Sequence, residues 1–149
     1  MEDIDAAVRQ LLERQAIEEV LLRYASAIDT KDYGTLRKLL CDDIHARYGE
    51  AVVDGGDELI KWIDEQTAHL SWQHHLLTVY HIDFVSDTEA KALTYHTSHQ
   101  IATATPNRRT KIVARYHDTV RKEQDGKWRI ADKDMEIGFV EERELETPS

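Results

Sequence analysis

The chain has 149 residues, of which 41% are hydrophobic and 32% charged, and its formal net charge is −10. We expect a single domain over 1–149, with a core at about 8–140 and an acidic tail at 141–149. The negative charge argues against a nucleic-acid partner, because such proteins carry basic surfaces. No apolar run approaches the roughly 20 residues that cross a membrane. With no signal sequence and no cysteine other than Cys41, we expect a cytoplasmic protein without a membrane partner.

The first half of the chain shows the pattern of helices. Apolar residues recur every three or four positions from Val8 to Ile28, which predicts one long helix with a buried face. A short second helix is expected over 33–40 and a strand over 44–48. A pair of glycines then breaks the chain before a third helix that begins at Asp57.

The second half of the chain is rich in β-branched and aromatic residues. Four segments of this kind, separated by turn-like breaks, predict an antiparallel meander over 72–85, 90–103, 111–122 and 128–140. Helices followed by strands indicate an α+β domain whose curved sheet wraps around the long helix. The tail after Glu141 is acidic, which predicts either a partly ordered cover or a disordered end.

Asp29 and His75 are the candidates for proton chemistry. His75 stands among apolar residues of a predicted strand, and an imidazole with a reference pKa of about 6.5 can accept a proton near neutral pH. A carboxylate that accepts a hydrogen bond from the other ring nitrogen would fix the tautomer of the imidazole. Asp29 lies near the C-terminal end of the first helix, where the helix dipole disfavours a negative charge, so its position requires a compensating partner.

The same residues also allow simpler interpretations. In the simpler interpretation, Asp29 serves only as the N-cap of the second helix. His75 is then a core histidine that is hydrogen-bonded to the backbone. A metal site at the histidine pairs 74–75 and 96–99 is not favoured, because neighbours and residues three apart on a strand point to opposite faces. Cys41 stands beside two aspartates whose charges oppose thiolate formation, so we expect a small buried residue rather than a nucleophile.

Two stretches of the sequence resemble the SnoaL-like family of enzymes, most closely its scytalone dehydratases. The run 24–38 is similar, without a gap, to the segment with the family's active-site aspartate, which places that role on Asp29. Tyr48 falls on a substrate-binding tyrosine. The stretch Gln73-His74-His75 is similar to the segment with the catalytic histidine, and the spacing to the residues downstream selects His75.

Other positions of the same resemblance complete the expected site. His99 falls on a second active-site histidine, and His117 falls near an active-site asparagine. Tyr24 matches a tyrosine of bile-acid dehydratases, whereas hexachlorocyclohexane dehydrochlorinases, which share the aspartate–histidine dyad, have a lysine there. Ile28 stands where scytalone dehydratases have a second tyrosine. Ile28 and His117 are expected to contact substrate, and so is Trp72 if its ring lines an aromatic pocket rather than the core.

The resemblance implies a cone-shaped α+β barrel with the pocket inside, and a dehydratase that needs no cofactor and no metal. In this reaction His75 would take a proton from carbon while Asp29 orients its ring. Tyr24 and Tyr48 would bind the carbonyl, and His99 would protonate the departing hydroxyl. The expected partner is a small hydrophobic or cyclic substrate that bears a carbonyl. The expected assembly is a homo-oligomer, for which the resemblance favours a trimer and leaves a dimer as the alternative.

Two other classes of function fit the same residues. An isomerase or a dehydrohalogenase would use the same dyad, because each also removes a proton from carbon. A non-catalytic protein that binds small molecules would use the same apolar cone. A hydrogen bond between Asp29 and His75 would favour an enzyme, since a carrier has no need to hold an imidazole against a carboxylate.

Overall fold

The computed structural model describes residues 3–146 of the chain. In this part of the chain the elements are α1 Ile4–Asp29, α2 Tyr33–Lys38, β1 Leu40–Tyr48, β2 Ala51–Asp54, α3 Gly56–Thr67, β3 Leu70–Ser86, β4 Glu89–Ala102, β5 Arg108–Lys122 and β6 Trp128–Glu144. The strands form one sheet in the order β2-β1-β6-β5-β4-β3. Neighbouring strands are antiparallel except β1 and β6, which run parallel. The predicted α+β class and the meander of four strands are confirmed.

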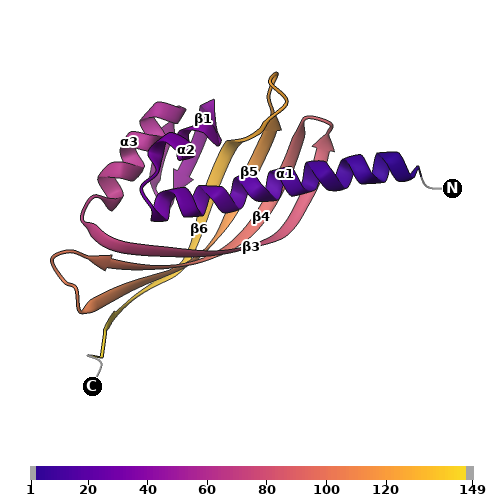
Figure 1. The fold of residues 1–149 in the computed structure, drawn as a ribbon. Helices are drawn as coiled ribbons and strands as arrows, with labels where there is room; N and C mark the ends of the chain where they lie inside the picture. The colour runs from indigo at the N-terminus through magenta and orange to yellow at the C-terminus, as the bar shows by residue number, and fades with distance from the viewer. Residues whose placement is uncertain (1–2, 147–149) are drawn as a thin grey trace.

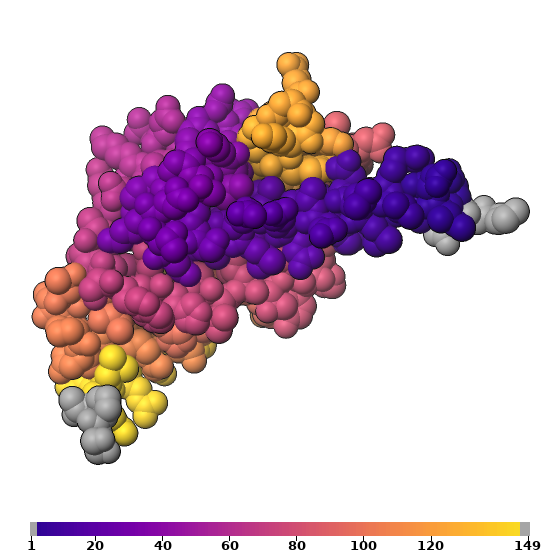
Figure 2. Space-filling view, in the orientation of Figure 1, coloured from indigo at the N-terminus to yellow at the C-terminus, as the bar shows by residue number. Residues whose placement is uncertain are grey.

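Helix α1 lies across one face of the sheet, which we call the inner face (Figure 1). Its N-terminus is capped by the Asp3 carboxylate, which accepts a hydrogen bond from the Asp5 N–H at 3.0 Å. The predicted apolar stripe is buried only from Ile17 onward. Leu11 and Leu12 are 64% and 61% exposed, because the first turns of the helix project past the strands (Figures 1 and 2). None of the described helices is long and apolar enough to span a membrane.

The turn after α1 decides which aspartate caps α2. The backbone N–H of Asp32 donates to the Ala27 carbonyl at 2.8 Å, and Lys31 adopts a φ of 54°, as in a left-handed helix end. The Asp32 carboxylate then accepts a hydrogen bond from the Thr35 N–H at 3.1 Å. Asp29, the last residue of α1, is therefore not needed as a cap.

Two segments differ from the sequence-based expectation. Strand β2 was not predicted, because its four residues are too few for a period to show; Gly49, with a φ of 64°, forms the turn that pairs it with β1. The expectation of a cover or a disordered end beyond residue 140 is wrong for 141–144, which extend β6 beside β5. Arg108 and Arg109, on β5, each lie 3.2 Å from a glutamate of this extension. Residues 147–149 of the tail lie outside the described residues.

A charged pair is buried in the middle of the inner face. Nζ of Lys133, on β6, lies 2.8 Å from a carboxylate oxygen of Asp118, on β5, and both side chains are 1% exposed. The ammonium also lies 3.9 Å from the ring centroid of Tyr116 and 4.3 Å from that of Tyr24. Burial raises the pKa of Asp118 and lowers that of Lys133, while their mutual attraction opposes both changes. Each charge thus depends on its partner to be tolerated in the core.

Replacing Lys133 with methionine should therefore destabilise the fold strongly. We expect the free energy of unfolding to fall by about 3–5 kcal/mol, because the Asp118 carboxylate is left buried without its partner. Urea denaturation followed by circular dichroism measures the change. The double variant Lys133→Met/Asp118→Leu should recover most of the loss, and Lys127→Met, in an exposed turn, should change little. Equal urea midpoints for Lys133→Met and the wild type would contradict this account of the pair.

Candidate functional site

Asp29, at the end of α1, and His75, in β3, form a hydrogen-bonded pair. Oδ1 of Asp29 lies 2.5 Å from Nδ1 of His75, and Oδ2 accepts a hydrogen bond from the His75 backbone N–H at 2.9 Å. The two side chains are 18% and 8% exposed, respectively. These two bonds supply the compensation that a carboxylate at the C-terminal end of a helix requires.

The pair leaves one nitrogen of His75 free for chemistry. Because Nδ1 donates to the carboxylate, we assign the proton of the neutral ring to Nδ1 and the lone pair to Nε2. Nε2 has no hydrogen-bond partner within residues 3–146. This arrangement can accept a proton from a bound molecule and stabilise the resulting imidazolium beside the carboxylate.

Contacts between the end of α1 and the start of β3 hold the pair in place. The side-chain amide of Gln73 donates to the Ile28 carbonyl at 2.8 Å, and Nζ of Lys31 donates to the Leu70 carbonyl at 3.2 Å. The side chain of Ile28, expected to contact substrate, is 5% exposed and belongs to the hydrophobic core. These hydrogen bonds join the helix end to the strand and so help to hold Asp29 within hydrogen-bond distance of the imidazole.

Two phenols form a second hydrogen-bonded pair on the inner face. The hydroxyl of Tyr24, on α1, is hydrogen-bonded to that of Tyr48, on β1. The ring of Tyr48 stacks on Trp62 of α3, with the ring centroids 4.8 Å apart. Burial raises the pKa of both phenols, so each stays neutral and can donate a hydrogen bond.

A row of aromatic rings connects the two pairs. The rings of His75 and His96 are nearly parallel with centroids 5.0 Å apart, and His96 stacks in the same way on Tyr116 at 4.9 Å. The rings of Tyr116 and Tyr24 pack edge to face, with their centroids 6.0 Å apart. Sequence reasoning missed His96 and Tyr116 as members of the site. The alternation of a strand, combined with the register of β3 and β4, would have placed His96 on the face of His75.

His96 is a neutral group in this row. Burial, together with the nearby charges of His75 and Lys133, lowers the pKa of His96 to about 3. Neither of its ring nitrogens has a hydrogen-bond partner among the described residues. Near neutral pH the imidazole of His96 is therefore uncharged.

Three of the expected site residues lie on the other face of the sheet. His99 is the cross-strand partner of His74, and the ring centroids of the two lie 6.4 Å apart. His117 is exposed, with Nε2 3.3 Å from a carboxylate oxygen of Glu136. Trp72 is 51% exposed and packs near His74. The structure therefore pairs Asp29 with His75 and Tyr24 with Tyr48 on the inner face, but it does not bring His99, His117 and Trp72 to them.

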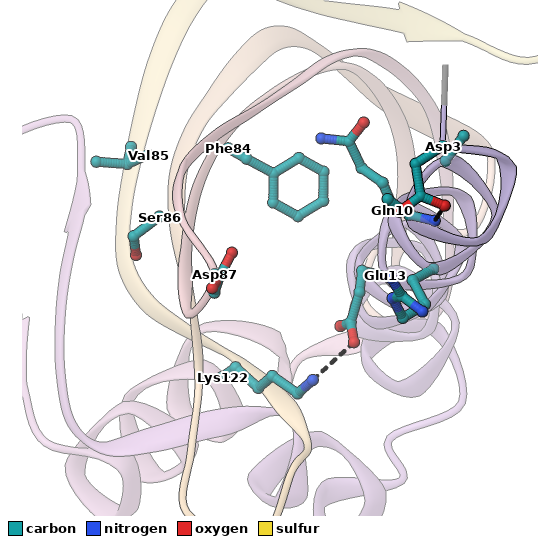
Figure 3. Close-up of a pocket in the computed structure, with 11 residues that line it drawn as sticks. Asp3, Gln10, Glu13, Phe84, Val85, Ser86, Asp87 and Lys122 are labelled. Carbon is teal, nitrogen blue, oxygen red and sulfur yellow. Dashed lines mark hydrogen bonds and ion pairs between the residues drawn. The ribbon is translucent and has the colours of Figure 1, made fainter. Parts of the chain in front are cut away.

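A wide hollow of about 760 Å³ lies between the first turns of α1 and the turn after β3, away from the dyad. Figure 3 shows the ring of Phe84 pointing from the strand toward the helix and the ion pair between Glu13 and Lys122. Hydrogen bonds from Lys122 and Trp128 lower the pKa of Glu13, so this carboxylate stays charged. The residues that line the hollow include no member of the dyad or the phenol pair.

The described part of the chain supports neither a cysteine nucleophile nor a metal site. Burial raises the pKa of the Cys41 thiol to about 12, and a hydrogen bond with Glu123 adds to the effect, so the cysteine is a buried neutral residue as predicted. Residues 3–146 hold no group of three or more His, Cys, Asp and Glu side chains placed to bind a metal ion.

Replacing His96 with phenylalanine should make the fold more tolerant of acid. Between about pH 6.5 and about pH 3 the unfolded chain protonates this residue while the folded chain does not, so stability falls by about 1.4 kcal/mol per pH unit as the pH is lowered. His96→Phe removes this loss and keeps a ring in the stack. Urea unfolding at pH 7, 6, 5 and 4 measures the slope, and His81→Phe, at an exposed position, should keep the wild-type slope. The same slope in His96→Phe and wild type would contradict the assignment.

Comparison with known proteins places the chain in a family. Residues 9–134 match the model of the SnoaL-like domain. No curated protein matches the sequence. Among solved structures, a protein from Novosphingobium aromaticivorans assigned as a scytalone dehydratase has 22% identity and a TM-score of 0.80, over 94% of this chain and 92% of its own. The hexachlorocyclohexane dehydrochlorinase LinA-type3 from Novosphingobium barchaimii has 16% identity and a TM-score of 0.84, over 96% and 99%. These likenesses show a shared fold, and the chain belongs to the SnoaL-like family.

Proposed function

We propose that the protein is a cofactor-independent dehydratase, a C–O lyase, that acts on a small cyclic substrate bearing a carbonyl group. The observation that carries the proposal is the hydrogen-bonded pair of Asp29 and His75, with the lone pair of Nε2 free. A proton on the carbon next to a carbonyl is acidic enough for an imidazole to remove when the enolate is stabilised. A dehydratase and a dehydrochlorinase among the structural neighbours add support for elimination.

In the proposed reaction, Nε2 of His75 takes the proton from carbon, and Asp29 stabilises the imidazolium that forms. The electron pair of the C–H bond passes through the enolate, and the C–O bond on the next carbon breaks. The imidazolium then returns its proton to the departing hydroxyl, so that water leaves. We assign this step to His75 rather than to the expected His99, because His99 lies on the opposite face of the sheet. One phenol of the Tyr24–Tyr48 pair donates a hydrogen bond to the enolate oxygen while it accepts one from the other phenol.

Proton abstraction can be tested without knowledge of the natural substrate. A panel of cyclic β-hydroxy ketones is incubated with the protein in D₂O, and proton NMR follows both the loss of the α-proton and the formation of the conjugated enone. We expect both signals with the wild type. His75→Gln and Asp29→Asn should slow them by about 100-fold or more. His74→Gln alters the neighbouring histidine on the other face and should react at the wild-type rate.

Each other outcome points to a different function. Exchange of the α-proton without loss of water would favour an isomerase, and turnover only of β-halo ketones would favour a dehydrohalogenase. Binding without exchange would favour a carrier and overturn the proposal. Equal rates for His74→Gln and His75→Gln would remove the dyad from the mechanism.

Tyr48→Phe tests the role of the phenol pair. The variant removes one hydroxyl that would face the enolate oxygen, so we expect the rate of enone formation to fall by about 100-fold, with a smaller change in KM. Tyr33→Phe is a matched control, because its hydroxyl binds Thr67 outside the phenol pair. A rate loss of similar size in both variants would indicate a general effect on the fold instead.

A further inference from the structure

A second group of polar side chains lies beside His75 on the inner face. His75 and Ser98 are cross-strand partners on β3 and β4, and Gln73 and Gln100 are the neighbouring pair on the same face. Gln73 is 4% exposed and Ser98 is completely buried. Such residues usually find partners in a protein core, because an unpaired polar group is costly to bury.

Two atoms of this group have no hydrogen-bond partner in the described part of the chain. The side-chain nitrogen of Gln73 donates to the Ile28 carbonyl at 2.8 Å, which fixes the amide and leaves Oε1 as a free acceptor. Neither this oxygen nor the hydroxyl of Ser98 makes a hydrogen bond within residues 3–146. One acceptor and one hydroxyl, both next to the proposed base, therefore have no hydrogen-bond partner among residues 3–146.

A small hollow lies on the same face, next to the pair of Gln73 and Gln100. It has a volume of about 180 Å³ and is lined in part by Gln100, Thr110, Arg108 and Glu142. This is the volume of about six water molecules, so it can hold a substituent but not a whole ligand of ordinary size. Arg108 lies 3.2 Å from Glu142, so the pair offers no unbalanced charge to an ionic group. The hollow suits a neutral polar group.

We propose that Gln73 and Ser98 bind a hydroxyl group of the substrate, remote from the carbon that loses its proton. This inference rests on the proposed function of His75. A hydroxyl can donate to Oε1 of Gln73 and accept from Ser98, whereas a carbonyl or a chlorine would leave Oε1 unpaired. Gln73 lies two residues before His75 on β3, a distance of about 6.6 Å along the strand. A hydroxyl bound to Oε1 of Gln73 would therefore lie across a ring from the carbon that reacts at His75.

Entry of this hydroxyl requires a movement of Gln100. Oε1 of Gln73 and the hydroxyl oxygen of Ser98 are shielded from solvent. Gln100 is half-buried, faces Gln73 across the strands, and lines the hollow. Rotation of its flexible side chain into the hollow opens a path to both atoms. The two glutamines and the serine then determine specificity, while His75 carries out the chemistry.

A matched pair of ketones tests the subsite through binding alone. NMR titration gives the Kd of 2-tetralone and of 6-hydroxy-2-tetralone, which differ only in a hydroxyl across the ring system. We expect the wild type to bind the hydroxylated ketone about tenfold more tightly. Ser98→Ala should abolish this preference without loss of stability, because it removes a buried hydroxyl that has no partner. Ser71→Ala, at an exposed serine of the neighbouring strand β3, should retain it.

The outcomes separate the subsite from the proposed reaction. If the wild type binds both ketones equally and exchanges the α-proton of both, the subsite is overturned and the dehydratase proposal stands. If the preference is present and lost in Ser98→Ala but no exchange occurs, the hydroxyl subsite stands and the reaction is overturned. If neither ketone shifts the amide resonance of Ser98, the subsite is overturned and a carbonyl-bearing ligand loses its support.

Discussion

The hydrogen bonds from His75 to Asp29 are the contact on which the geometry of the site depends. They join the end of the long helix to the edge strand of the sheet through both a side chain and a backbone N–H. The amide of Gln73 reinforces this junction at Ile28. Because Asp32 caps the next helix, the Asp29 carboxylate is available to accept hydrogen bonds from His75. Two aspartates three residues apart thus have different roles: Asp32 caps a helix, and Asp29 holds the imidazole of His75.

The rest of the inner face keeps charge confined to a few positions. Lys133 and Asp118 neutralise each other, and His96 is kept uncharged by burial. His75 differs from His96 in having a carboxylate hydrogen-bonded to its ring. Sheltered from water, such charges interact more strongly than they would at a surface. The arrangement favours reactions in which one proton moves and no other group changes charge.

Features set by neighbouring residues, such as helices and short motifs, can be predicted from the sequence. Features set by the pairing of distant strands cannot. The long helix follows from its apolar period, and the run from Tyr24 to Lys38 points to Asp29 without reference to its neighbours in space. His99 and His117 were expected in the site but lie on the other face of the sheet, because the face of a strand residue depends on register, and a shift of one residue reverses it. The acidic tail likewise becomes a strand because arginines more than 30 residues earlier lie beside it.

The parallel pairing of β1 with β6 means that the site is assembled from both ends of the chain. Residues 45–48 pair with residues 132–135, so Tyr48 reaches its place only when the last strand is available. Contacts between such distant segments are formed late, because closing a long loop costs entropy before the contact repays it. During synthesis the dyad between α1 and β3 can form early, while the phenol pair must wait for β6 to emerge. The interior that holds the dyad and the phenol pair is therefore complete only when the last strand has joined the sheet.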